Sequence, residues 1–83
     1  MNVIVAQKDR WLLWHRTDKT RGEWHSFKLE RLGQQKRYEK SNWWFGHNGQ
    51  RLARNSDAGL LRQYWPETYA WVEQACSQLL HPQ

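Results

Sequence analysis

The first half of the chain shows short apolar runs and one alternating segment, both of which are patterns of strands. A short apolar run at 3–6 and a second one within 9–16 are both typical of strands. In 23–30, Phe27 and Leu29 fall on one side of an extended chain and the residues between them fall on the other. We therefore expect 9–16 and 23–30 to form an antiparallel hairpin whose apolar side faces a core.

A second hairpin is predicted around the dipeptide Asn48-Gly49. This pair tolerates the positive φ angles of a tight hairpin turn, and it is flanked by 42–47 and 50–53. The polar, charge-rich segment 31–41 between the two hairpins shows no sustained period. We expect it to be a loop with a possible edge strand.

The period changes after position 55. Ser56 is a candidate helix cap, with Asp57 in the favourable first turn, and Pro66 both ends this short helix and opens the next one. The second helix places apolar residues at helical spacing: Tyr69, Val72, Cys76, Leu79 and Leu80.

These elements predict a single α+β domain over 1–83. It comprises a small antiparallel sheet of three to five strands, in two hairpins, followed by a short helix and a longer C-terminal helix packed on one face of the sheet.

The seven tryptophans do not fit easily into one core. Trp43 and Trp44 are adjacent, so on a strand they point to opposite faces, and a single helical layer covers only one face. Trp11 and Trp14 raise the same problem. Two or three uncovered rings would expose roughly 300 to 700 Å², which a monomer rarely leaves in water without a ligand or partner. A curved sheet that packs every ring inside remains the structural alternative.

Charge is unevenly distributed along the chain. The net charge is +5, but 1–62 holds all 13 basic residues and six acidic ones, whereas 63–83 holds only Glu67 and Glu73. Basic and aromatic residues interleave in a first stretch, 16–28, and in a second stretch, 36–44. The candidate binding residues, from the second stretch and the turn after it, are Lys36, Arg37, Tyr38, Lys40, Trp43, Trp44, Arg51 and Arg54.

This mixture favours a binding module for single-stranded nucleic acid, because cations neutralise phosphates while rings stack on unpaired bases. The second helix has no Lys or Arg to contact phosphates, so we expect any nucleic acid to bind the sheet. Two alternatives stay open. One is a protein-interaction or inhibitor module, or a homodimer, that uses exposed tryptophans. The other is a small ribonuclease that uses His47 with Arg51 or Tyr38, against the simpler interpretation of His47 as a surface residue beside a turn.

Other function classes lack their motifs. The only cysteine, Cys76, excludes an intrachain disulfide and a cysteine-based zinc site and favours a reducing compartment, so we expect a cytoplasmic protein. The apolar run at 3–6 is too short for a signal sequence or a membrane span. The four histidines lack metal-ligand spacing, and no glycine-rich phosphate loop or catalytic serine motif occurs. We expect neither a cofactor nor a metal, and binding rather than catalysis.

Overall fold

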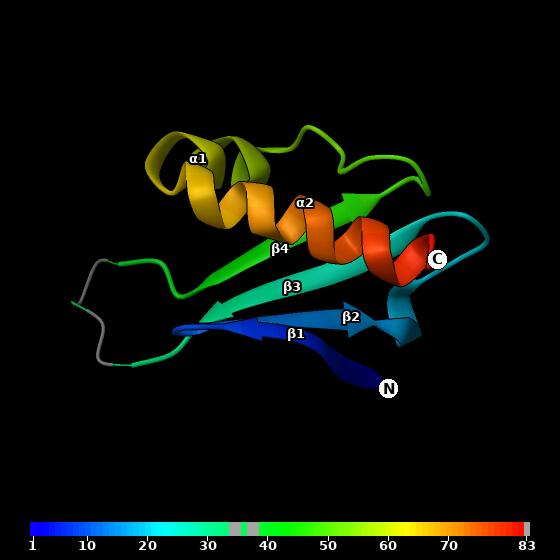
Figure 1. The fold of residues 1–83 in the computed structure, drawn as a ribbon, viewed down its shortest axis with the longest axis horizontal. Helices are drawn as coiled ribbons and strands as arrows, with labels where there is room; N and C mark the ends of the chain where they lie inside the picture. The colour runs from blue at the N-terminus through cyan, green and yellow to red at the C-terminus, as the bar shows by residue number, and fades with distance from the viewer. Residues whose placement is uncertain (34–35, 37–38, 83) are drawn as a thin grey trace.

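Each strand of the sheet pairs with its neighbour in the sequence. The computed structural model describes residues 1–33, 36 and 39–82. In chain order they form β1 (Asn2–Lys8), β2 (Trp11–Arg16), a single 3-10 turn (Thr17–Lys19), β3 (His25–Arg31), β4 (Asn42–His47), α1 (Ser56–Tyr64) and α2 (Pro66–Leu80). The strands make one antiparallel sheet in the order β1-β2-β3-β4, and the two helices follow it (Figure 1). The predicted α+β fold is confirmed.

The first predicted hairpin forms between β2 and β3, with Leu13 opposite Leu29 and His15 opposite Phe27. The second one differs from the expectation, because β4 pairs with β3 and 50–53 makes only a single bridge, His47 to Leu52. The Asn48 side chain accounts for this difference. Its Oδ1 accepts the backbone N–H groups of Gln50 at 2.8 Å and Arg51 at 2.9 Å, which holds the chain in a turn beyond the Asn48-Gly49 pair.

The free edge of β4 is closed by side chains from the start of α1. Asn55 donates its side-chain amide to the Trp44 carbonyl at 2.9 Å, and Asp57 accepts the Trp44 N–H at 2.8 Å. Asn55 also caps the helix, because its Oδ1 accepts the Ala58 N–H at 2.8 Å. The cap is therefore Asn55 and not Ser56, which is the first helical residue. The same segment starts the helix and satisfies the backbone of an edge strand.

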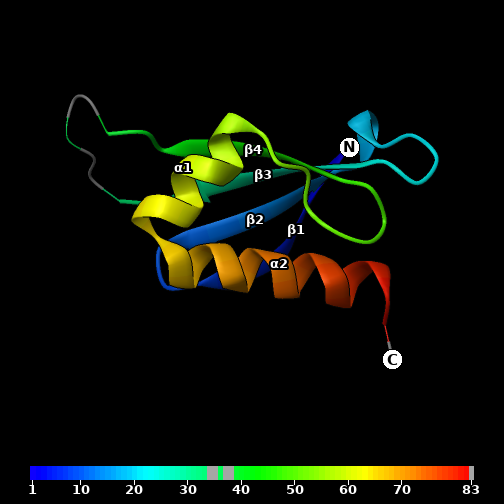
Figure 2. The ribbon, with the colours of Figure 1, turned by 90° about the horizontal axis from the view of Figure 1, so that it is seen from above.

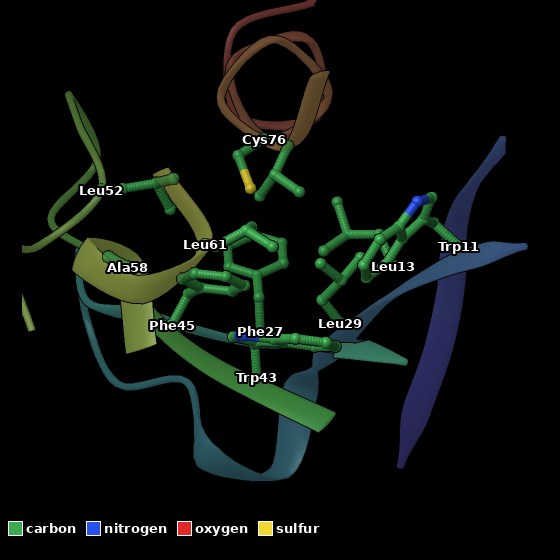
Figure 3. Close-up of a cluster of buried hydrophobic side chains, with 11 residues drawn as sticks. Trp11, Leu13, Phe27, Leu29, Trp43, Phe45, Leu52, Ala58, Leu61 and Cys76 are labelled. Carbon is green, nitrogen blue, oxygen red and sulfur yellow. The ribbon is translucent and has the colours of Figure 1, made fainter. Parts of the chain in front are cut away.

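Both helices pack on one face of the sheet, and the core lies between the two layers (Figure 2, Figure 3). Phe27, Leu29 and Trp43 come from the sheet, and Leu61 and Cys76 come from the helices. Burial raises the pKa of the Cys76 thiol to about 12, with Glu73 adding to the effect, so this thiol is a packing group.

Three tryptophans form a cluster at one end of the core. The ring of Trp11 lies 5.3 Å from that of Trp43 and 5.9 Å from that of Trp65, and Trp43 and Trp65 are 5.5 Å apart. Edge-to-face and tilted pairs at such separations are favourable beyond the area that they bury. Trp65 is the single residue between α1 and α2, and its ring joins this cluster. Pro66 begins the second helix, as predicted.

Gly59 offers a test of the helical layer, because it lies in α1 with open space where a Cβ would be. Gly59→Ala is expected to raise the free energy of unfolding by about 0.5–1 kcal/mol, since glycine within a helix costs that much relative to alanine. Urea unfolding followed by tryptophan fluorescence measures the change. Gly22→Ala is the matched control: Gly22 has φ +59, where a side chain is strained, so this variant should be less stable than the native chain. A gain of stability in both variants, or in neither, would contradict this account.

Candidate functional site

The face of the sheet away from the helices carries a row of large side chains that crosses all four strands. Ile4 is paired with Trp14, Trp14 with Lys28, and Lys28 with Trp44, so these four residues share that face. Strands are about 4.8 Å apart, which places the backbones of Trp14 and Trp44 about 10 Å from each other with Lys28 between them. Trp44 is 43% exposed and Ile4 is 47% exposed.

Two cations lie over the tryptophan rings of this face. The Lys28 Nζ is 5.1 Å from the ring centroid of Trp14 and 5.9 Å from that of Trp44, and the Arg16 guanidinium carbon is 4.7 Å from the Trp44 centroid. The Trp14 Nε1–H donates to a carboxylate oxygen of Glu30 at 3.2 Å, which fixes the orientation of that indole. Within the described part of the chain, neither Arg16 nor Lys28 forms an ion pair.

A third tryptophan joins this face because a glycine makes room for it. Trp24 lies over Gly46, where an added Cβ would come 2.0 Å from the ring atom Cζ2. Trp24 is 46% exposed, and its backbone is fixed by paired hydrogen bonds with Arg21, at 2.8 and 2.9 Å. We call Trp14, Trp24 and Trp44, together with Arg16 and Lys28, the aromatic face.

The predicted divergence of the two adjacent tryptophans is confirmed. Trp43 is 1% exposed in the core, whereas Trp44 belongs to the aromatic face. A structure that packs all seven rings inside is therefore excluded. Trp43 can act on a ligand only by supporting the sheet.

The other predicted binding residues are not gathered at one place. Lys40 lies near the aromatic face, because its Nζ is 3.1 Å from Asp57, the residue that binds the Trp44 backbone. Lys36 is exposed in the connection between β3 and β4, and Arg37 and Tyr38 fall outside the described residues. Arg51 and Arg54 line a separate hollow beside the helices.

Four residues of the aromatic face were not among the predicted site residues: Trp14, Arg16, Trp24 and Lys28. A signal for them existed, since the alternation in 23–30 places Trp24 and Lys28 on the water side of the strand. What the sequence lacked was the register that sets Trp14, Lys28 and Trp44 side by side.

Three histidines lie together where β2 and β4 end and β3 begins. The His15 Nε2 is 3.2 Å from the His25 Nδ1, and the His15 ring stacks on Phe27 at 4.9 Å. His47 is only 2% exposed, and its Nδ1 accepts the Gly49 N–H at 3.0 Å. The expectation of a surface histidine beside the turn is thus wrong. A buried imidazole that binds its own backbone is poorly placed to meet a substrate.

The pKa values of two of these histidines are lowered. Burial is the larger cause for His15, followed by the charge of His25; for His47, burial comes first, followed by His25 and His81. Both rings therefore favour the neutral form in the folded protein. Among residues 1–33, 36 and 39–82, no group of three or more His, Cys, Asp or Glu side chains is arranged to hold a metal ion.

Comparison with protein-family models, curated proteins and solved structures finds no match to this chain. Neither α1 nor α2, the two α-helices of the described residues, has the length and apolar character needed to cross a membrane.

The lowered pKa of His47 predicts a dependence of stability on pH. Because the folded pKa lies below the ordinary value of 6.5, the neutral ring stabilises the fold above that pH, and this contribution is lost as the pH falls toward the folded pKa. His47→Asn keeps an acceptor for the Gly49 N–H and cannot be protonated. We expect its melting temperature to fall less than that of the native chain between about pH 7.5 and about pH 5.5, as measured by circular dichroism.

His47→Leu is the control, because it removes both the charge and the acceptor. It should be less stable than His47→Asn at both pH values, since it leaves the Gly49 N–H without its partner. An equal fall for the native chain and His47→Asn would show that other groups set the pH dependence.

Proposed function

We propose that this domain binds single-stranded nucleic acid on its aromatic face. The observation that carries the proposal is the row Trp14, Lys28 and Trp44, in which two indoles flank a cation without an ion-pair partner among the described residues. This row offers a single strand two kinds of contact. Its rings can stack on the faces of the bases, and its cation can bind a phosphate.

The chemistry of the face suits unpaired bases. Stacking of a base on an aromatic side chain contributes about 1–3 kcal/mol and tolerates every base, because each base has a π-face. One common RNA-binding module is a four-stranded sheet whose aromatic residues stack two or three bases in this way. Arg16 lies over Trp44, and a guanidinium plane can itself stack on a base, so ring and cation can form one continuous stack. A duplex hides its base faces, which predicts a preference for single strands.

The charges on this face argue against self-association through it. A twofold dimer brings the same patch of both copies together, so the Lys28 and Arg16 side chains of both copies would share one interface. Lys28 lies in the middle of the row, where the fully buried centre of such an interface would be. Lysine is depleted at interface centres, and like charges opposed there are destabilising. A polyanion fits the same surface without this cost.

Trp44→Ala tests the stacking. Because Trp44 is half-exposed and outside the core, the variant should fold and should lose about 1–3 kcal/mol of binding energy, or about 5- to 150-fold in affinity for a short single-stranded oligonucleotide. Tryptophan fluorescence titration with single-stranded DNA, single-stranded RNA and duplex at two salt concentrations measures the affinity. Tyr64→Ala is the matched control, since Tyr64 is 62% exposed on α1 and should bind as the native chain does.

Two outcomes of this titration would contradict the proposal. One is an equal affinity of the native chain and Trp44→Ala. The other is an affinity that does not change with salt, because displacement of counterions from phosphates makes nucleic-acid binding strongly salt-dependent.

Gly46→Ala tests the part of the face that Trp24 forms. Gly46 does not have a positive φ, so alanine fits the strand, but its Cβ would overlap the indole and force Trp24 off the sheet. We expect single-strand binding to weaken although no aromatic residue has been removed. The double variant Trp24→Ala with Gly46→Ala separates the causes: it should bind no more weakly than Trp24→Ala alone. If Gly46→Ala binds as tightly as the native chain, Trp24 is not part of the site.

A further inference from the structure

A second cationic feature lies beside the helices, away from the aromatic face. It is a hollow of about 540 Å³ between the segment that follows β4 and the junction of α1 with α2. Its charged and aromatic lining consists of Arg51, Arg54, Arg62, Tyr69 and Glu73. We call it the arginine hollow. Its volume lies within the range of about 300–1,000 Å³ that is common for small-molecule sites.

Positive charge in the arginine hollow is in excess. The lining includes three arginines and one acidic residue, Glu73, and within the described part of the chain none of the three arginines forms an ion pair. Three arginines around one hollow repel one another, and this cost is relieved when an anion enters. The excess of two positive charges matches a dianion.

Tyr69 supplies a neutral donor in the same place. Burial and the charge of Glu73 raise the pKa of its phenol, although Arg62 and Arg54 lower it. The hydroxyl therefore remains protonated at neutral pH and can donate a hydrogen bond. Arg54, Arg62 and Tyr69 all line the hollow.

The set of donors distinguishes among anions. A guanidinium presents two parallel N–H groups that match the oxygens of a phosphate, and a hydroxyl adds a single donor. A phosphate monoester carries about −1.5 to −2 charges at neutral pH and has three acceptor oxygens. A single carboxylate has one charge and two oxygens, so it would leave part of the hollow's charge unmatched.

We propose that the arginine hollow binds the phosphoryl group of a phosphate monoester. Arg54 and Arg62 hold its oxygens, the Tyr69 hydroxyl donates to it, and Arg51 adds charge at the rim. The group can belong to a small molecule or to the 5′-terminal phosphate of an oligonucleotide. The chemistry that recognises it is the same in both cases. This site does not depend on the aromatic face.

The test is a titration of the 15N-labelled native chain at constant ionic strength, followed by NMR chemical shifts. Adenosine 5′-monophosphate is the probe, and adenosine is its uncharged counterpart. We expect saturable shifts around Arg54, Arg62 and Tyr69 with the monophosphate and none there with adenosine. Absence of saturation at millimolar concentrations, or equal shifts with both probes, would overturn the proposal.

Two double variants identify the residues. Arg54→Gln with Arg62→Gln should weaken binding of the monophosphate at least tenfold. Lys8→Gln with Arg10→Gln removes the same charge from exposed positions outside the hollow and should leave it unchanged. Equal weakening in both would show that net charge alone is responsible and would overturn the site. Circular dichroism establishes that each variant is folded.

The source of the phosphate is found with two oligonucleotides of one sequence, one with a 5′-phosphate and one with a 5′-hydroxyl. Tighter binding of the phosphorylated strand, lost in Arg54→Gln with Arg62→Gln, assigns the hollow to a nucleic-acid end. Equal affinity of the two strands, with monophosphate binding intact, assigns it to a small molecule. Trp44→Ala should not alter binding of the monophosphate, so failure of one proposal is distinguishable from failure of the other.

Discussion

The structure depends on one geometric constraint: successive side chains on a strand point to opposite faces of the sheet, and this sheet has one helical layer. Trp43 therefore reaches the core, where its ring packs against those of Trp11 and Trp65. Trp44 is forced to the other face, which the helices do not cover. The burial of Trp43 and the exposure of Trp44 are thus two consequences of the same alternation along β4.

Short-range periodicity was sufficient to predict most elements but could not predict which residues meet. The alternation in 23–30 and the helical spacing after Pro66 lie within single segments, and the structure confirms both. The predicted pairing of β4 with 50–53 is reduced to one bridge, His47 to Leu52, because the side chain of Asn48 binds the amides that a longer strand there would have used. The row of Trp14, Lys28 and Trp44 needs a register between strands, which is set by pairing across connections of different length and is absent from local pattern.

Packing requirements explain how so small a domain tolerates this arrangement. The indole nitrogen of Trp43 is buried without a hydrogen-bond partner among the described residues, a cost of about 1–3 kcal/mol that ring contacts in the tryptophan cluster offset. On the aromatic face, Arg16 and Lys28 cover part of the exposed rings, and each such contact contributes about 0.5–1 kcal/mol. The face is thus stable enough to persist in water while its rings and charges stay accessible.

The distribution of charge gives the two proposed sites a common physical basis. Helix α2 has two acidic residues, Glu67 and Glu73, and no Lys or Arg. All the described basic residues therefore lie in the sheet, the loops and α1. Arg16 and Lys28 on one side, and Arg54 and Arg62 on the other, lack ion-pair partners among the described residues. Unpaired like charges disfavour the compact state. A ligand that binds only the folded chain offsets that cost, because its binding free energy adds to the stability of the fold. Anions are the ligands that fit this condition on both surfaces.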